Sequence, residues 1–281
     1  MQLSNYHSHT SLSDGHCLME DIVSEAINCN LISMGFSEHS PVPFYSDWNM
    51  KASDITNYIN KAKELKVKYA SQLEIYCGLE LDYFEPYNKQ ILALSQVEKL
   101  DYTIGSVHYM GFFADGEAFN IDNVLEKYEQ GIVELFNNDP VLLYQKYYEA
   151  VIKMIEQMQP AIIGHIDKIR MFNTNNRFFN ESSEEYKKAW KQVLVAAKEK
   201  GCIVELNTRG MYKFSAELSY PSSELLHAMQ RMDIPVTINS DCHKAEEIVK
   251  GFDLAFNLLK DAGYTEYMQL RNGKWVGNKI L

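Results

Sequence analysis

The sequence predicts one α/β domain built as a barrel of seven parallel strands, with a metal site at the carboxyl ends of those strands. Two observations lead to this prediction. Seven short β-type runs alternate with longer helical patterns along the 281 residues. Six of the eight histidines stand at or just after the end of such a run. The carboxyl ends of barrel strands form a single face, so these histidines are expected to converge there.

Length and composition are those of an ordinary globular protein. A chain of 281 residues is normal for an α/β barrel, and 46% hydrophobic with 23% charged residues is enough to build a large core. The net charge of −11 argues against a protein that binds a nucleic-acid backbone, because such binding relies on Lys and Arg. A small ligand in a locally positive pocket remains open.

The cysteines and the N-terminal segment bear on the compartment. The five cysteines form no C-x-x-C pair, so we interpret them as reduced thiols without a disulfide framework or a zinc ribbon. No apolar run approaches the length of a membrane span, and the first ten residues lack the basic start and apolar segment of a secretory signal. We therefore expect a cytoplasmic protein that does not contact membranes.

The first half of the chain supplies four of the predicted strands, at residues 3–9, 31–37, 74–82 and 102–108. Helical patterns separate them, at residues 18–30, from a cap at Ser53 or Asp54 to residue 72, and at 89–99. The alternation is then interrupted at residues 109–139, which contain an apparent helix at 124–136. We predict that this segment is a lid or an insertion.

The second half supplies the other three strands, at residues 161–166, 202–207 and 234–240. Helices are predicted at residues 143–158, 183–200, 222–231 and 245–262. Pro160 stops the first of these helices, and Gly201 is the expected C-terminal cap of the second. Because no linker or short repeat interrupts the pattern, residues 1–281 are predicted to form a single domain.

The histidines and carboxylates at the strand ends are the candidate metal ligands. His7 and His9 are two residues apart, so an extended chain places both imidazoles on one face. A pair of this kind is only part of a metal site, but four more histidines and three carboxylates fall at the same level of the barrel. The full set is His7, His9, Asp14, His39, Glu80, His108, His165, Asp241 and His243. His16 and His227 lie in a loop or helix and are assigned no role.

These residues stand in motifs that resemble the polymerase and histidinol phosphatase (PHP) superfamily. The motifs occur in order over residues 7–243 as His7-Ser8-His9-Thr10 with Ser13-Asp14-Gly15, Ser37-Glu38-His39, Gly78-Leu79-Glu80, Gly105-Ser106-Val107-His108, Gly164-His165-Ile166-Asp167 and Ser240-Asp241-Cys242-His243. Residues 36–44, 105–109 and 164–170 are most similar to those of the histidinol-phosphate phosphatases. The resemblance implies a distorted TIM-like (β/α)7 barrel, in agreement with the strand count.

The resemblance also implies three divalent metal ions. His7, His9, Glu80 and Asp241 would hold the first ion, Glu80, His108 and His165 the second, and Asp14, His39 and His243 the third. Imidazole and carboxylate ligands suit zinc, manganese or iron(II), so the ligand set does not select among them. Six positive charges against three carboxylates would let an acidic protein bind a phosphate ester.

Two arginines are candidates for contact with that phosphate. Arg170 and Arg209 follow the fifth and sixth strands, and a guanidinium binds phosphate oxygens with two parallel hydrogen bonds. Arg170 is also a candidate catalytic residue, although an ion pair with Asp167 is the alternative role for it. Asp241 or His243 is the candidate proton donor to the leaving group.

The implied activity is hydrolysis of L-histidinol phosphate to L-histidinol and phosphate, in histidine biosynthesis, by attack of a metal-bound hydroxide. A PHP phosphoesterase acting on a nucleotide or another small phosphate ester is the close alternative. An amidohydrolase-type metal barrel and a non-catalytic binding module are more distant ones. Residues 41–49 and 109–139 are where we expect the amine and imidazole of the substrate to be recognised. The oligomeric state is left open.

Overall fold

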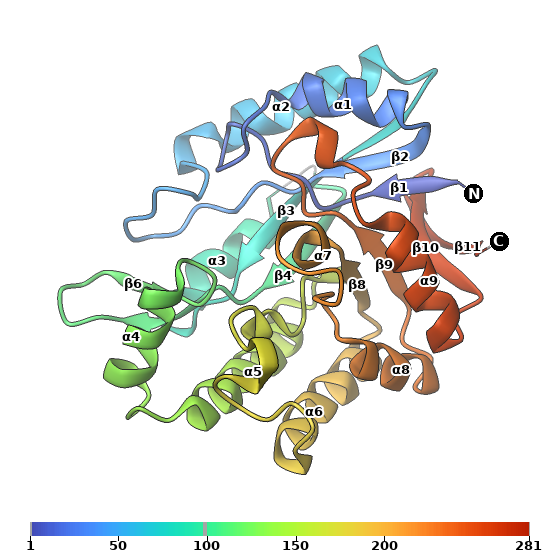
Figure 1. Cartoon of the computed structure of the whole chain (residues 1–281). Coiled ribbons are helices and arrows are strands. Elements are labelled where there is room, and N and C mark those ends of the chain that lie inside the picture. The colour runs from blue at the N-terminus through green and yellow to red at the C-terminus, as the bar shows by residue number, and fades with distance from the viewer. Residues whose placement is uncertain (1, 98–99, 281) are drawn as a thin grey trace.

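The computed structural model describes residues 2–97 and 100–280 and has seven parallel strands at its centre (Figure 1). Neighbouring strands follow the order β1 (Leu3–Asn5), β2 (Leu31–Phe36), β3 (Glu74–Asp82), β4 (Tyr102–Ser106), β7 (Ile162–Ile163), β8 (Ile203–Asn207) and β9 (Val236–Asn239). Ser8 and Cys242 bridge the first and last strands, and the His9 amide donates to the Cys242 carbonyl at 2.9 Å. The ring is therefore nearly closed, and the predicted distorted (β/α)7 barrel is confirmed.

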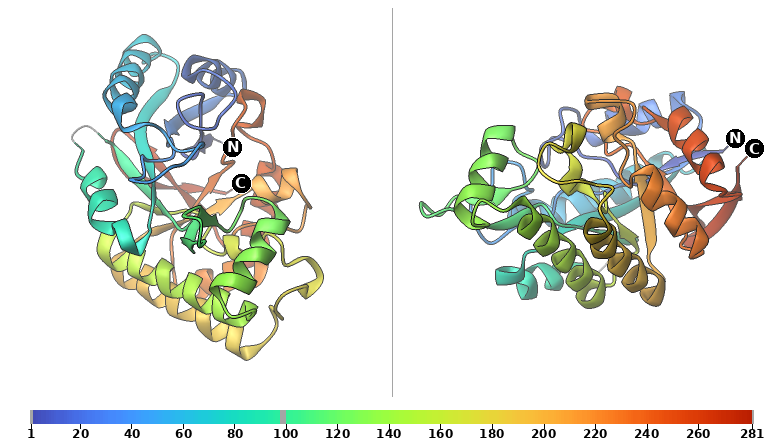
Figure 2. Two further views of the ribbon diagram at one scale, coloured as in Figure 1. Left: turned by 90° about the vertical axis from the view of Figure 1, so that its left-hand side faces the viewer. Right: turned by 60° about the horizontal axis from the view of Figure 1, so that its bottom comes forward.

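Helices surround the strands, as the alternating sequence pattern predicts (Figure 2). They are α1 (Met19–Asn28), α2 (Ile55–Lys68), α3 (Asn88–Ser95), α4 (Leu125–Leu135), α5 (Pro140–Met158), α6 (Glu184–Lys200), α7 (Arg209–Lys213), α8 (Ser223–Arg231) and α9 (Phe252–Ala262). Gly201 ends α6 at φ 67°, a left-handed conformation that favours glycine, as predicted. Of the helix predicted at 89–99, residues 98–99 lie outside the described residues. None of the described helices is long and apolar enough to cross a membrane.

Most strands are shorter at their carboxyl ends than predicted. The first strand ends at Asn5 and not at residue 9, and β7 contains only Ile162 and Ile163. In both places the chain leaves the regular ladder before it reaches the histidines. Most of the side chains predicted to bind metal thus stand on short irregular segments beyond the strands, at the mouth of the barrel, and Glu80 stands within β3.

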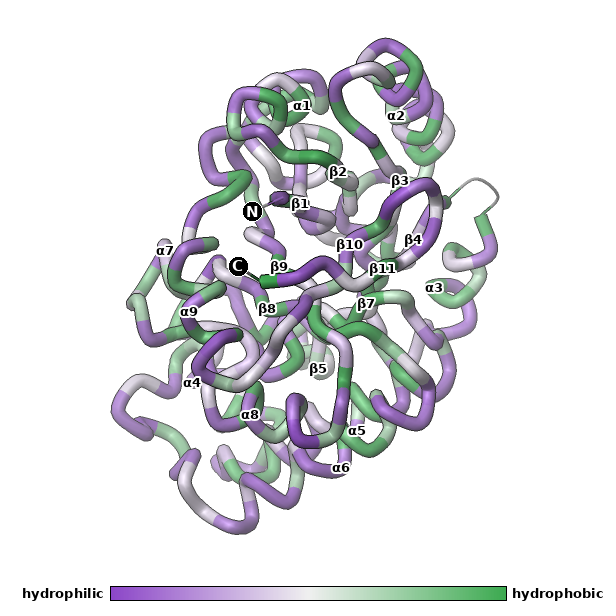
Figure 3. The backbone as a smooth tube through the Cα atoms, turned by 90° about the vertical axis from the view of Figure 1, so that its right-hand side faces the viewer, coloured by the Kyte–Doolittle hydropathy of each residue, from purple (hydrophilic) through white to green (hydrophobic). Residues whose placement is uncertain are grey.

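A C-terminal hairpin that was not predicted covers the opposite, amino-terminal end of the barrel. It consists of β10 (Glu266–Arg271) and β11 (Lys274–Lys279), and Figure 3, drawn from this end, shows it crossing in front of the barrel strands. Beneath it, Tyr6 packs against Tyr102 and Trp275, with ring centroids 6.0 and 5.1 Å away. This apolar cluster is separate from the main core. It closes one end of the barrel and leaves the other end for a site.

The segment predicted as a lid or insertion lies at the carboxyl ends of the strands (Figures 1 and 2). It folds as the hairpin of β5 (Tyr109–Phe112) and β6 (Ala118–Asn120) followed by α4. Phe119 and Tyr128 attach it to the core, because both side chains are buried. Its action as a lid, and the single-domain organisation of residues 1–281, remain predictions.

Candidate metal centre

His7 and His9 lie on one face just beyond β1, as the sequence pattern predicts, with ring centroids 5.0 Å apart. The His7 Nε2 atom is 3.2 Å from Glu80 Oε2 and 3.7 Å from Asp241 Oδ1. His9 Nε2 is 3.5 and 3.3 Å from the same two oxygens. Two imidazole nitrogens and two carboxylate oxygens therefore surround one point, and they come from the chain after β1, from β3 and from the chain after β9.

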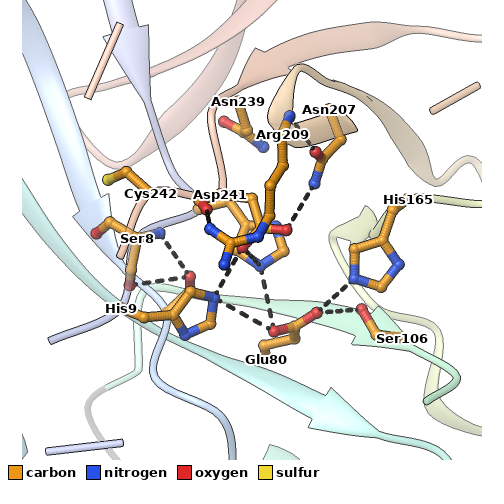
Figure 4. A network of polar contacts seen from close by, with 12 residues as sticks. Ser8, His9, Glu80, Ser106, His165, Asn207, Arg209, Asn239, Asp241 and Cys242 are labelled. Carbon is orange, nitrogen blue, oxygen red and sulfur yellow. Dashed lines mark hydrogen bonds and ion pairs between the residues drawn. The ribbon is translucent and has the colours of Figure 1, made fainter. Parts of the chain in front are cut away.

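Glu80 lies between two such groups, and each of its oxygens faces a different one. While Oε2 faces the first group, Oε1 is 3.0 Å from His165 Nε2 and 3.7 Å from His108 Nε2. Ser106 Oγ donates to Oε1 at 2.6 Å and fixes the orientation of the carboxylate. Figure 4 shows Glu80 with His9 on one side and His165 on the other. This is the arrangement that a carboxylate bridging two cations requires.

A third group forms at the rim of the barrel mouth. Asp14 Oδ1 is 3.6 Å from His39 Nε2, and Asp14 Oδ2 is 3.0 Å from His243 Nε2. His39 also faces the first group, because its Nδ1 lies 2.8 Å from Glu80 Oε2. The structure thus brings together all nine side chains that were predicted as metal ligands. Their role as ligands is taken up as a proposal below.

Several of these polar atoms are buried and have no hydrogen-bond partner, as expected for atoms that bind a cation. Such atoms include His7 Nε2, His9 Nε2, Glu80 Oε2 and Asp14 Oδ1. Buried polar groups in folded proteins are nearly always paired, and an unpaired one costs about 1–3 kcal/mol. These atoms face one another at contact distance, so a divalent cation between them would satisfy several at once. The donor set fits the metals that the resemblance implies.

The electrostatics of the cluster keep its carboxylates ionised. Burial alone would raise the pKa of Glu80, but the charges of His7, His39 and His108 outweigh it and hold that pKa well below its ordinary value. For His7, burial has the opposite effect and lowers the pKa. The nearby carboxylates, above all Glu205, outweigh burial and raise the pKa of His7 well above its ordinary value. Attraction between these buried imidazoles and carboxylates thus offsets part of the cost of burying them, a function that bound cations would take over.

Two carboxylates that the sequence analysis did not identify support the histidines from behind. Glu205 on β8 accepts hydrogen bonds from His7 Nδ1 at 2.9 and 3.1 Å and from the His165 amide at 2.7 Å. Asp82 at the end of β3 hydrogen-bonds to His108 Nδ1. Both carboxylates are fully buried. A carboxylate on Nδ1 leaves Nε2 free to bind metal, so Glu205 and Asp82 orient the two histidines.

A cavity of about 530 Å³ opens over the cluster. Asp14, His39, His108, Asp241 and His243 form its floor. The loop at 41–49 and the segment at 109–139, the two regions predicted to recognise the substrate, both contribute to its walls, through Asp47, Trp48, Asn120, Asp122 and Asn123. Trp48 packs edge-on against His39 and His108, with ring centroids 4.5 and 5.4 Å away.

The two predicted arginines differ in position. Arg209 lines the cavity, and its Nη1 lies 2.7 Å from both the Asp241 carbonyl and His243 Nδ1. Arg170 does not belong to the cavity lining and instead pairs with Asp167 at 3.2 Å and Glu181 at 2.7 Å. This is the alternative role that the sequence left open for Arg170, and its predicted phosphate contact remains untested. Lys168, which was not predicted as a site residue, lines the cavity in its place.

The two histidines assigned no role belong to none of these ligand groups. The His227 ring hydrogen-bonds to the Ser223 carbonyl within α8 at 2.8 Å, and His16 is exposed in the loop before α1. Both placements agree with the sequence interpretation.

Comparisons with known proteins agree with this fold. A protein of Schizosaccharomyces pombe named "Probable histidinol-phosphatase" is 27% identical over 95% of this chain and 89% of its own length. A solved structure from Listeria monocytogenes has a TM-score of 0.80 at 24% identity and covers 89% of this chain and 99% of its own. The histidinol phosphate phosphatase of Lactococcus lactis, solved with zinc, L-histidinol and phosphate, has a TM-score of 0.72 at 22% identity. It covers 97% of this chain and 98% of its own. Residues 5–209 match the PHP domain, so this chain belongs to the PHP domain family.

Proposed function

We propose that this protein is a metal-dependent phosphomonoesterase that hydrolyses L-histidinol phosphate to L-histidinol and phosphate. The observation that carries the proposal is the position of Glu80, whose two oxygens face two separate groups of histidines at the base of the cavity. The names of the fission-yeast relative and of the Lactococcus structure support the choice of substrate.

Three divalent ions suit the charges of the site better than two. The cluster holds five carboxylates when the two supporting residues are included, namely Asp14, Glu80, Asp82, Glu205 and Asp241. Six metal charges together with the Arg209 guanidinium would leave the site positive, whereas four would only bring it to neutrality and so attract a phosphate ester less. We therefore propose the ligand sets that the resemblance implies, in which Glu80 would belong to both of the first two sets. Zinc, manganese or iron(II) would lower the pKa of a bound water and polarise the phosphoryl oxygens.

The protein's own residues bind and orient the ester. Arg209 is held by the Asp241 carbonyl, and the partly buried position of its guanidinium next to His243 keeps it ready to contact non-bridging phosphate oxygens. Glu205 and Asp82 fix the rings of His7 and His108, so the floor of the cavity does not rearrange when the substrate arrives. This pre-organisation is the main contribution that we assign to the chain itself.

The outer wall of the cavity suits the rest of the substrate. The Trp48 ring, which stacks on Tyr109, contributes aromatic surface to the wall beside His39, and Asp47 contributes a negative charge next to it. L-Histidinol carries an imidazole and an amine, which match an aromatic surface and a carboxylate respectively. A nucleotide would place its base against the same wall but has no amine cation for Asp47. This difference favours histidinol phosphate over the nucleotide alternative.

The test is a phosphate-release assay on protein whose metal content is measured in the same preparation, under anaerobic conditions. Histidinol phosphate, AMP and an aliphatic ester without an amine, such as glycerol phosphate, are compared at equal concentration. We expect kcat/KM to be highest for histidinol phosphate and to vanish after chelation. Faster hydrolysis of AMP would favour the nucleotide alternative, and no phosphate release from any ester with metal bound would refute a phosphatase.

A further inference from the structure

One cation in the cavity wall has no role in the site described so far. Lys168 follows β7 by a few residues, and its side chain is only 7% exposed. Its Nζ lies 3.2 Å from Asp122 Oδ2 and 5.5 Å from the centre of the Tyr220 ring. Lysine is seldom buried to this degree, because removing its charge from water is costly. A buried ammonium at the edge of a catalytic cavity therefore suggests a function.

Lys168 and Arg209 flank the metal ligands on different sides. The Asp122 carboxylate that holds Lys168 is 3.9 Å from His108 Nε2, which belongs to the second group. Arg209 instead contacts Asp241 and His243, which belong to the first and third groups. In phosphoryl transfer the attacking and leaving oxygens lie on opposite sides of phosphorus. Two cations on different sides of the ligand cluster can therefore serve different oxygens of the same ester.

Asp241 and His243, the proton donors expected from the sequence, are proposed above as metal ligands. The two other basic residues of the cavity wall, Lys213 and Arg209, are also less suited to the leaving group. Lys213 lines the cavity, but it is about a third exposed and is held by Glu247 at 2.7 Å. Arg209 cannot give up a proton, since a guanidinium stays charged at all relevant pH values. Lys168 combines burial, a cavity position and a transferable proton.

We propose that Lys168 contacts the ester oxygen of the bound phosphate monoester and stabilises it as the leaving group. The assignment rests on the proposed phosphatase activity. The P–O bond breaks with its electron pair on the ester oxygen, and a proton from Nζ neutralises that oxygen to give the alcohol. The proton that the attacking water gives up restores the ammonium, so no further reactant is needed. Asp122 is a positioning residue that holds Nζ in place.

The leaving group itself provides the test. Histidinol phosphate has a poor alkoxide leaving group, whereas 4-nitrophenyl phosphate releases a stable anion that needs no proton. General acid catalysis contributes about 100-fold or more. Lys168→Met should therefore lower kcat/KM for histidinol phosphate on the order of 100-fold and that for 4-nitrophenyl phosphate less than about 5-fold. Lys168→Arg, which keeps the charge but not the transferable proton, should remain impaired on histidinol phosphate.

Lys213→Met is the matched control, because it removes the other lysine of the same cavity. It should change the rates on both esters by the same factor. Lys168→Met leaves Asp122 unpaired, so the double variant with Asp122→Asn is measured as well, and the melting temperature of each variant is recorded. If the folded double variant loses kcat/KM for histidinol phosphate but not for 4-nitrophenyl phosphate, that result also supports the assignment.

Affinity for inorganic phosphate gives a second readout that does not depend on turnover. The phosphate product no longer carries the ester oxygen, so Lys168→Met should leave its dissociation constant, measured by calorimetry, within about threefold of wild type. Equal losses on both esters, or a large loss of phosphate affinity, would overturn the assignment and make Lys168 a phosphate-binding or structural residue. If the metal-loaded wild type hydrolyses neither ester, the proposed function fails first and the Lys168 role fails with it.

Discussion

Replacing Glu205 with glutamine should weaken metal binding without touching a metal ligand. Every neighbour of this carboxylate is a donor. Besides His7 and the His165 amide, Asn207 and Asn239 each donate to it at 2.9 Å. Glutamine has the same size, but one of its two ends is an NH₂ group, which must face at least one of these donors. The substitution therefore breaks at least one of the hydrogen bonds to this side chain and loosens its hold on His7 and His165.

The size of the effect follows from those contacts. A hydrogen bond to a charged group contributes about 1.5–3 kcal/mol, and part of that energy is used to hold His7 in the tautomer with Nε2 free. Loss of such a supporting residue typically weakens metal affinity 10–100-fold, or about 1.4–2.8 kcal/mol. We expect the dissociation constant of the tightest metal to rise about 30-fold. Turnover at saturating metal should fall less than the affinity does.

The assay is competition with a chromophoric chelator at fixed pH, together with the melting temperature of the metal-free protein. Asp167→Asn is the matched control, because Asp167 is also fully buried and accepts from Arg170 and the Ser222 amide, not from a predicted ligand. It should lower the melting temperature and leave metal affinity unchanged. If the Glu205→Gln protein binds metal within about threefold of wild type, Glu205 does not support the metal ligands.

Three further results are expected. Glu80→Gln removes the shared charge, so elemental analysis should find fewer ions per chain and phosphate release should fall at least about 100-fold; full activity would exclude the bridging role. Chelation should lower the melting temperature by about 5–10 °C when metal had been present at 100 times its dissociation constant, since that occupancy stabilises by about 2.7 kcal/mol. An unchanged melting curve would mean that no metal is bound tightly. Trp48→Ala should raise KM for histidinol phosphate about tenfold and affect glycerol phosphate less, because only the former has an aromatic ring to pack on Trp48; equal effects would remove Trp48 from substrate recognition.

The barrel could be predicted because its strands are continuous buried runs. The nine residues of β3 carry no solvent-facing alternation, and their predicted limits agree with the structure. The hairpin β10–β11 was missed although it has a recognisable turn. Asn272 and Gly273 have φ angles of 50° and 72°, the positive values that an Asn-Gly hairpin turn requires. The polar residues around this turn concealed the strands.

The candidate ligands could be predicted because each stands at the end of a strand, where a barrel gathers side chains from distant parts of the chain. Glu205 and Asp82 stand within or at the end of predicted strands and lack a motif of their own. A charged residue in an otherwise apolar buried run was the available signal, since such a residue needs a buried partner.

The contrast between Lys168 and Arg170 could not be predicted. Both belong to the short 3₁₀ helix at Lys168–Arg170, and a separation of two residues decides which one faces the cavity. Asp167 and Glu181 hold Arg170 away from it, and Glu181 comes from a loop whose course the sequence pattern does not specify. Side-chain direction in an irregular segment depends on such tertiary contacts.

In the proposed cluster of three metal ions, Glu80 joins two of them. Anomalous diffraction from crystals of the zinc-loaded protein would locate each ion relative to this carboxylate. We predict peaks about 2 Å from each of the two oxygens of Glu80, one near His7 and His9 and the other near His108 and His165, with a third peak beside Asp14. A single peak, or peaks that do not contact Glu80, would mean that Glu80 does not bridge two ions.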